Sequence, residues 1–288
     1  MAKETKYSIR DLKRDFPTDE ACLALIFDTL HSRKCSCGGE YKQVKGRKQF
    51  YCSNCRYQIA PTANTIFNKS DTPLSLWFHA IFIFSNAKSG ISAKEMERQL
   101  GVTYKCAWRI LSMIRKSLKQ DNTKLKGEVE IDTGFFGGKG YGGENNERLS
   151  HVMTKKSIVN VAVERGGKIK AEIIPVASAQ IMESFIKRNI ESKATKIFTD
   201  TSAVYVRSDI VYKRESVNHS KKEYVRGKAH VNTVETFFSH LKRSIKGTFK
   251  AISKQHLQSY LDAFVFHYNN RGNDNQRFGV LLNTLLRA

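Results

Sequence analysis

Hydrophobic positions in the first 118 residues recur mainly at helical spacing. Residues 7–30 carry such a pattern, with a break where Thr18 or Asp19 can open a second helix. Residues 31–66 lose the periodicity and are rich in glycine, cysteine and lysine, with short alternating runs. Helical spacing returns over residues 74–118 and is interrupted once. This part is therefore expected to hold helices around a small segment of different character.

From residue 128 the pattern changes to short apolar or alternating runs that are typical of strands. Residues 158–163 and 169–175 flank Arg165-Gly166-Gly167, which predicts a β-hairpin. Residues 206–229 are basic and irregular. The remaining expected elements are strands over 129–136 and 196–199 and helices over 182–190, 231–245 and 254–268. We predict a mixed α/β protein in three parts, residues 1–66, 67–122 and 123–288.

The charge of the chain narrows the choice of partner. The 288 residues hold 49 Lys and Arg against 27 Asp and Glu, a net charge of +22. Such an excess repels itself and favours a polyanionic partner, of which nucleic acid is the obvious one. No apolar run is long enough for a membrane span, and the N-terminus lacks the apolar core of a signal peptide. We therefore expect a cytoplasmic, nucleoid-associated protein whose six cysteines stay reduced.

Four of these cysteines form two close pairs, Cys35 with Cys37 and Cys52 with Cys55. Two such pairs can supply the four thiolates of a tetrahedral structural zinc site. A segment with so few large apolar residues also needs a metal to stabilise it. The alternatives are four incidental cysteines in a reduced protein, or a site in which His31 replaces Cys35.

Residues 91–110 have the arrangement of a helix-turn-helix. Ser92 and Glu95 form a possible capping box for the first helix, and Gly101 provides the turn. Thr103 opens the second helix, and the residues available to DNA there are Thr103, Tyr104, Lys105 and Arg109. An ordinary helical hairpin uses the same caps and turn and remains the alternative.

Three acids lie at positions that suit a metal site. Asp132 lies within an apolar strand, Asp200 ends a second strand, and Glu235 lies on the helix over 231–245. Carboxylates near a core edge are costly unless they meet a cation, and three that converge suit Mg²⁺ or Mn²⁺. Taken singly, each has an ordinary explanation, because Asp200 can cap a turn, Glu235 can pair with Lys242, and Asp132 can simply end a strand.

The helix that carries Glu235 is strongly basic beyond it. Glu235 and Lys242 lie two turns apart on one side of the helix, so the acid can bind metal while the lysine binds a phosphate. Arg243 and Lys246 add DNA-binding candidates. Residues 213–254 together hold eleven Lys and Arg and three Glu, which favours contact with a phosphate backbone.

These motifs together resemble bacterial insertion-sequence transposases of the DDE class with an N-terminal zinc ribbon, the ISXO-like branch. The resemblance spans nearly the whole chain and is most specific near its end. The segments that carry it include the cysteine pairs, residues 62–67, 91–109, 130–132 and 199–200, the run His230-Val231-Asn232-Thr233-Val234-Glu235, Lys242-Arg243, and Tyr268-Asn269-Asn270-Arg271.

The resemblance implies a ribonuclease-H-like catalytic domain after the zinc ribbon and the helix-turn-helix. Asp132, Asp200 and Glu235 match the metal-binding acids of the family, and Lys242 matches the basic residue that follows the glutamate. The implied reaction is metal-dependent hydrolysis at the element ends, followed by attack of the freed 3′-hydroxyl on target DNA. Double-stranded DNA and further copies of the chain are the implied partners.

Three features depart from the family pattern or fall outside it. The first cysteine pair is one residue shorter than usual, and Thr133 follows Asp132 where an acid is common. The glycine-rich residues 137–143 lack a nucleotide-loop pattern and are interpreted as a flexible loop on the DNA side. Two other functions remain open: a DNA-binding regulator with an inactive fold, and a nuclease that cuts without joining.

Overall fold

The computed structural model describes residues 6–137, 156–192, 195–210, 212–218, 221 and 223–287. Two compact units make up the chain: Met1–Lys119 together with Asn270–Ala288, and Gln120–Asn269. Of the glycine-rich residues 137–143, those from 138 onward lie outside the described residues. Among the helices in these ranges, none is both long and apolar enough to cross a membrane.

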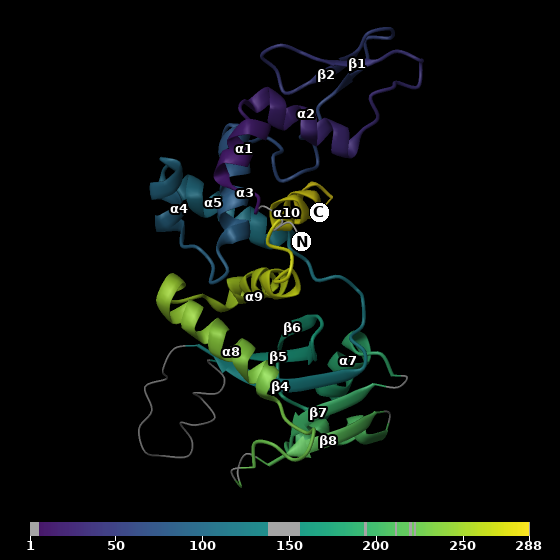
Figure 1. Ribbon diagram of the computed structural model, residues 1–288, viewed down its shortest axis with the longest axis vertical. Helices are drawn as coiled ribbons and strands as arrows, with labels where there is room; N and C mark the ends of the chain where they lie inside the picture. Colours follow the sequence, from purple (N-terminus) through teal and green to yellow (C-terminus); the bar gives the residue numbers. More distant parts are fainter. Residues whose placement is uncertain are drawn as a thin grey trace. The chain divides into compact units, whose positions relative to one another are not determined.

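The first unit begins with two helices and a small antiparallel sheet (Figure 1). The side chain of Thr18 caps the second helix, as the sequence predicted. Phe27 on this helix stacks on Phe50 of the sheet with 4.0 Å between ring centroids, which joins the cysteine-rich segment to a helix. The elements are α1 (Ile9–Asp15), α2 (Asp19–Leu30), β1 (Tyr41–Gln43), β2 (Phe50–Cys52) and β3 (Gln58–Ile59).

Three further helices follow: α3 (Leu74–Asn86), α4 (Ala93–Leu100) and α5 (Tyr104–Ser117). The two helices and the turn predicted over residues 91–110 are present as α4 and α5, and whether they act as a DNA-binding helix-turn-helix stays a prediction. Gly101 ends α4 in the left-handed conformation, with φ of 65°, and Thr103 Oγ1 caps α5 by accepting the Cys106 N–H. Ser92 caps α4, but the Glu95 carboxylate accepts from Arg98 and Gln99 instead of closing the predicted capping box.

A last helix, α10 (Arg277–Leu286), returns to the first unit and packs against α2, α3 and α5. The sequence analysis assigned no element here and grouped residues 270–288 with the strands before them. The structure groups them with the helices because the apolar side of α10 is buried there, from Phe278 to Leu286. Arg277 is only 2% exposed and donates to the Ser85 carbonyl oxygen.

The second unit is built on a five-stranded sheet in the order β6-β5-β4-β7-β8. Its strands are β4 (Glu128–Phe136), β5 (Ser157–Glu164), β6 (Ile169–Ile174), β7 (Lys196–Asp200) and β8 (Lys213–Val217). The predicted hairpin is present as antiparallel β5 and β6, whereas β7 and β8 run parallel to β4. The sequence analysis described β8 as irregular because an edge strand of charged residues carries little hydrophobic pattern.

Helices cover both faces of this sheet. On one face lie α7 (Ala179–Asn189) and the 3₁₀ helix η1 (Ala203–Ile210), which pack on Ile131 and Ile197. On the other lie α8 (Asn232–Ser244) and α9 (Lys254–Asn269), separated by the π-helical turn η3 (Ile245–Phe249). Figure 1 shows α8 running across the strands, with α9 following it.

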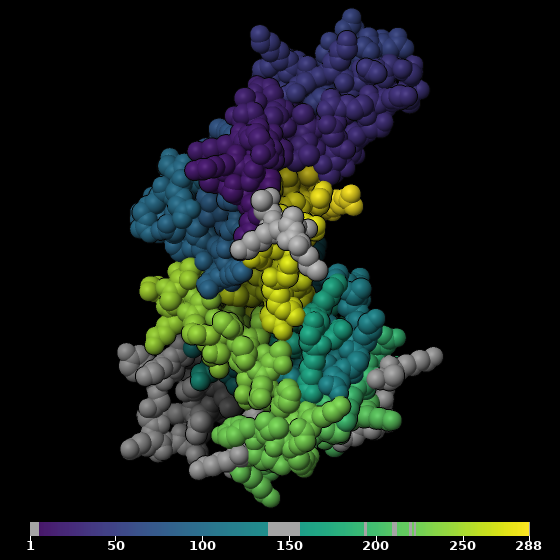
Figure 2. All heavy atoms as spheres, in the orientation of Figure 1, coloured from purple at the N-terminus to yellow at the C-terminus, as the bar shows by residue number. Residues whose placement is uncertain are grey.

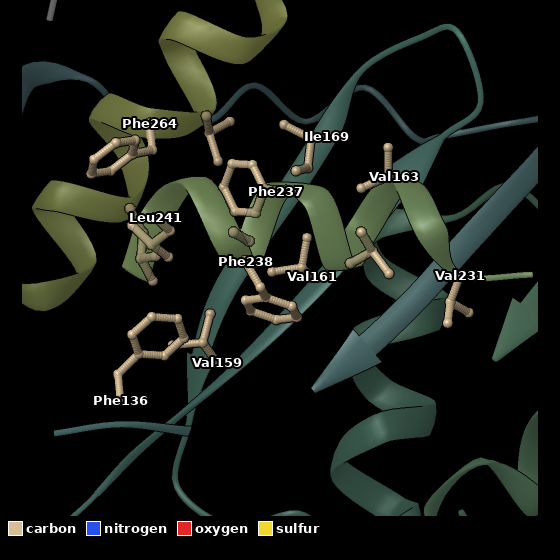
Figure 3. Packing of buried hydrophobic residues seen from close by; sticks show 14 of the residues in the cluster. Phe136, Val159, Val161, Val163, Ile169, Val231, Phe237, Phe238, Leu241 and Phe264 are labelled. Carbon is tan, nitrogen blue, oxygen red and sulfur yellow. The ribbon is translucent and has the colours of Figure 1, made fainter. Parts of the chain in front are cut away.

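The core beneath α8 is dense and aromatic (Figure 3). Phe238 points from α8 toward the sheet, where its ring centroid lies 5.9 Å from that of Phe136. Gly134 leaves room for the same ring, since a Cβ built there would lie 2.7 Å from Phe238 Cε1. The distance between α8 and β4 therefore depends on the absence of a side chain at Gly134.

The outer edge of β6 is covered by side-chain amides instead of another strand. Asn269 bonds both backbone groups of Ile169, Gln120 bonds both of Ala171, and Gln258 accepts the Ile173 N–H. These contacts satisfy alternate residues of an edge that would otherwise offer a template for another chain. They also hold the end of α9 against the sheet.

We expect Gly134→Ala to destabilise the second unit by about 1–3 kcal/mol, because the added methyl forces Phe238 and α8 away from β4. Differential scanning calorimetry measures the loss. Gly247→Ala serves as the control, since nothing lies within 4 Å of a Cβ at Gly247. Equal melting of the two variants would contradict the close packing at Gly134.

Candidate functional site

The four predicted cysteines form one cluster at the tip of the small sheet. Their sulfurs all lie within 4.8 Å of one another, with 3.7 Å between Cys35 and Cys55 and 3.4 Å between Cys37 and Cys52. Four thiolates bound tetrahedrally at about 2.3 Å lie about 3.8 Å apart, so the cluster fits a structural zinc ion. Cys35 belongs to the cluster, and the group does not include His31.

The turns around the cysteines favour thiolates. The backbone N–H of Cys37 points at Cys35 and lowers the pKa of that thiol to about 6. The N–H of Gly39 lowers the pKa of Cys37 in the same way. Although the N–H of Tyr57 lowers the pKa of Cys55, the neighbouring sulfurs raise it to about 12 overall. Four thiolates this close repel one another, and a divalent cation removes that repulsion.

The second helix of the helix-turn-helix exposes Tyr104, Lys105 and Trp108. The sequence analysis missed Trp108, although its spacing of four from Tyr104 places both on one face. Thr103 is exposed beside them while its hydroxyl caps the helix. Arg109 instead donates to Ser70 and Thr72 at 3.2 and 2.9 Å, so it stabilises the unit, and its DNA contact stays a prediction.

Asp132 and Asp200 lie on neighbouring parallel strands of the second unit. The register pairs Glu130 of β4 with Phe198 of β7, and two residues further along both strands come Asp132 and Asp200. Residues two apart share a face of a strand. Phe198 belongs to the core beneath α8, so both aspartates lie on the sheet face that α8 covers. Each is partly exposed.

The helix α8 is held along β4 at points on both sides of Asp132. At one end, the N–H groups of Thr233 and Val234 donate to the Glu130 carboxylate at 2.7 and 3.2 Å. At the other, Phe238 packs on Gly134. Asp132 lies between Glu130 and Gly134 on the same strand face, and Glu235 lies between these contacts on the helix. The three predicted acids are therefore brought to one region of the unit.

The opposite face of β4 carries a buried polar network. Thr133 donates to Asn160 Oδ1 at 2.8 Å and lies 3.2 Å from the Tyr205 hydroxyl. Burial raises the pKa of Tyr205, and the charges of Asp132 and Asp200 raise it further. Both aspartates thus act on the same buried group. Thr133 points into this network, away from the face that α8 covers.

The basic candidates lie on the outer side of α8 and the turn after it. Lys242, Arg243 and Lys246 are exposed, and the α8 surface is open to solvent on the visible face in Figure 2. Lys242 Nζ lies 5.9 Å from the Phe136 ring centroid, at the β4 end beyond Gly134. Arg243 contacts His240 at 3.1 Å. The helix therefore presents Glu235 and Lys242 along one side, as its periodicity predicted.

Glu130 is a site residue whose role the sequence analysis did not identify. Its side chain is fully buried, and its oxygens accept from Arg165 Nε at 2.8 Å and from Thr233 Oγ1 at 2.9 Å, besides the two helix N–H groups. His230 Nδ1 lies 3.2 Å away. The sequence does show Glu130 as a second acid in the apolar strand of Asp132, which could have indicated a buried role. The groups that donate to it, Arg165 and the start of α8, are far away in sequence and could not be identified.

The chemistry of the three predicted acids suits a divalent cation, because carboxylate oxygens are hard ligands. Asp132 and Asp200 each follow by two residues the last paired position of β4 and β7, Glu130 with Phe198. Two carboxylates on neighbouring strands repel each other, and a cation with oxygen ligands would relieve that repulsion. In the described part of the chain, the four cysteines are the one group of three or more His, Cys, Asp or Glu side chains whose ligand atoms all lie within 4.8 Å of one another. The three carboxylates thus share a region without converging that tightly.

The comparison with protein-family models identifies one family. The ISXO2-like transposase domain matches residues 124–269, about half of the chain and nearly all of the second unit. A protein described as an uncharacterized protein in transposable element ISH50 of Halobacterium salinarum is 26% identical over 236 residues, which cover 78% of this chain and 79% of that protein. The Mos1 strand transfer complex is similar at 12% identity with a TM-score of 0.29, covering 73% of this chain and 75% of that one.

Removal of zinc is expected to unfold the small sheet and leave the second unit folded, because the segment has few large apolar residues of its own. Chelator-treated protein should lose amide-exchange protection at Tyr41–Gln43 and Phe50–Cys52 and release zinc measurable by elemental analysis. Cys52→Ser should lose the metal, whereas Cys106→Ser, outside the cluster, should retain it. Full zinc content in Cys52→Ser would contradict the assigned ligands.

Proposed function

The chain belongs to the ISXO2-like transposase family, and on this premise we propose that it cuts DNA at the ends of an insertion sequence and joins the freed 3′-hydroxyl to target DNA. The observation that carries the proposal is the register that brings Asp132 and Asp200 to one level of β4 and β7, beneath the helix that carries Glu235. We assign the second unit to the ribonuclease-H-like fold. Its mixed sheet, with acids on a central strand, a neighbouring strand and a covering helix, supports that assignment.

Asp132, Asp200 and Glu235 would hold Mg²⁺ or Mn²⁺. The bound metal would activate the attacking oxygen and stabilise the leaving oxygen of an in-line displacement at phosphorus. The protein's own part is to fix the three carboxylates and to bind the DNA strand beside them. Lys242, exposed two turns along the helix from Glu235, would bind a phosphate, and Arg243 and Lys246 would extend this contact along the backbone.

The reaction consists of two displacements without a covalent enzyme intermediate. First, water attacks a phosphorus at the element end, and the bond between phosphorus and the 3′-oxygen breaks, which frees a 3′-hydroxyl. That hydroxyl then attacks a phosphorus of the target strand and displaces another 3′-oxygen. The second step makes one phosphodiester as it breaks one, so it needs no nucleotide cofactor.

The first unit would recognise the DNA. The helix-turn-helix offers Tyr104, Lys105 and Trp108 on an exposed helix face, which suits contact with a groove. The net charge of +22 supports strong non-specific attraction to the phosphate backbone. Because two ends must be joined, we propose that the protein works as a dimer or larger assembly on DNA.

Replacing Asp132 by Asn is expected to abolish integration and leave DNA binding unchanged, because it removes one metal-binding charge without changing the size of the side chain. A plasmid integration assay with the gene's own flanking DNA as donor measures this. Glu172→Gln is the matched control, an acid of the same sheet that pairs with Arg188.

The products decide between the proposed function and its alternatives. Joined products with short target duplications, absent in the Asp132 variant, support a transposase. Cut ends that are never joined indicate a nuclease, and DNA binding without cutting indicates a regulator. Integration by the Asp132→Asn protein would mean that this aspartate is not catalytic.

Lys105 and Arg109 are expected to differ although they lie on one helix. Lys105→Ala should weaken binding to duplex DNA and reduce the slope of log affinity against log salt by about 1, as for one lost phosphate contact. Arg109→Ala should mainly lower stability, by about 1–3 kcal/mol, since it removes two hydrogen bonds from a guanidinium. Binding isotherms at several salt concentrations and thermal melts measure the two effects.

The opposite pattern would contradict the geometry of the first unit. An Arg109→Ala protein of normal stability with weakened DNA binding would place the arginine on DNA. An unchanged salt slope for Lys105→Ala would remove that lysine from the interface.

A further inference from the structure

We propose that Glu130 is a positioning residue, which caps the start of α8 and thereby sets where Glu235 lies relative to Asp132 and Asp200. The proposal rests on the proposed function, because it assigns the metal to those three acids. Glu130 itself is buried beneath the helix and has no surface exposed to solvent.

The start of α8 has no cap of its own. Val231 occupies the N-cap position and offers no side-chain acceptor, so the first helical N–H groups need a partner from elsewhere. Glu130, 103 residues earlier in the chain, supplies it through Oε2, which accepts from both Thr233 and Val234. The negative carboxylate also complements the positive end of the helix dipole. Glu235 follows one residue after the capped amides.

Arg165 ties this cap to the rest of the site. Its Nε donates to Glu130 at 2.8 Å, and another nitrogen donates to the His230 carbonyl oxygen at 3.0 Å, just before α8. Its guanidinium lies 3.9 Å from the ring centroid of Phe198, two residues before Asp200. One glutamate and one arginine therefore contact the three segments that carry the acids: β4, β7 and the start of α8.

Only a carboxylate satisfies all the donors around Glu130. Oε1 accepts from Arg165 and from the Thr233 hydroxyl, while Oε2 accepts from the helix. A glutamine has one acceptor oxygen and would turn its NH₂ group toward donors on one side. Glu130→Gln is therefore isosteric but cannot keep both sets of bonds, and the end of α8 should loosen.

Glu128 provides a matched control on the same strand. It also accepts from Arg165, at 3.0 Å, but its side chain is 40% exposed, and this contact does not involve α8. Glu128→Gln removes the same charge and one Arg165 contact and leaves the helix cap in place. A general loss of negative charge near Arg165 would affect both variants, whereas loss of the cap affects only Glu130→Gln.

The test compares the two variants with wild type in full-length protein. Amide hydrogen exchange reports on the cap, and Mn²⁺ titration followed by electron paramagnetic resonance reports on the site. We expect Glu130→Gln to speed exchange at Thr233 and Val234 and to raise the Mn²⁺ dissociation constant about tenfold or more, as for other residues that orient metal ligands. DNA affinity and exchange in β5 should stay at the wild-type values. Glu128→Gln should match wild type in all of these measurements.

Unchanged exchange at Thr233 and Val234, or unchanged Mn²⁺ affinity, in Glu130→Gln would overturn the positioning role. Equal losses in Glu128→Gln would overturn it too, since they would trace to charge alone. Wild-type protein that binds no Mn²⁺ would overturn the proposed metal site itself, an outcome distinct from equal binding by wild type and variant. If Glu130→Gln does not fold, Thr233→Val carries the test. It removes the hydroxyl bond to Glu130 and retains the backbone N–H, and several-fold weaker Mn²⁺ binding is expected.

Discussion

The carboxylate of Glu130 is buried completely, and this imposes one constraint on the whole second unit. A buried charge is tolerated only when paired and hydrogen-bonded, and here the donors come from the β5–β6 turn through Arg165 and from the first turn of α8. Sliding the helix along β4 would leave that charge without the donors from α8. The constraint thus fixes the register between helix and sheet, and with it the relation of Glu235 to Asp132.

Capping across the fold recurs in the first unit. The helix α3 begins after Pro73, which offers no side-chain acceptor, and Asp19 accepts the N–H groups of Leu74 and Ser75 at 2.9 Å each. By contrast, α4 and α5 begin with their own caps, Ser92 and Thr103. A helix with a local cap has its first residue determined by its neighbours in the sequence. A helix whose cap comes from a residue distant in the sequence has a defined first residue only once the unit has folded.

Alternation along β4 separates the chemistry of the site from its support. One face carries Glu130, Asp132 and Gly134 toward α8, and the other carries Thr133 into the network with Asn160 and Tyr205. The departure at Thr133 therefore leaves the face with the three acids unaltered. The two sides of α8 are separated in a similar way. Its buried side packs on the sheet and fixes the helix that carries Glu235, and its exposed, basic side is available to a polyanion.

The sequence by itself determined what depends on neighbours along the chain. Cysteine spacing predicted the cluster, side-chain caps and Gly101 predicted α4, α5 and the turn between them, and apolar runs predicted four of the five strands of the large sheet. Tertiary structure alone decided the edge strand β8, the return of α10 to the first unit, and the capping of α8 by Glu130. These features join residues a hundred or more positions apart or lie at an edge with little hydrophobic pattern, so no local periodicity encodes them. The sequence suggested the three acids proposed to bind metal, and strand register and one buried charge decide where they lie in the unit.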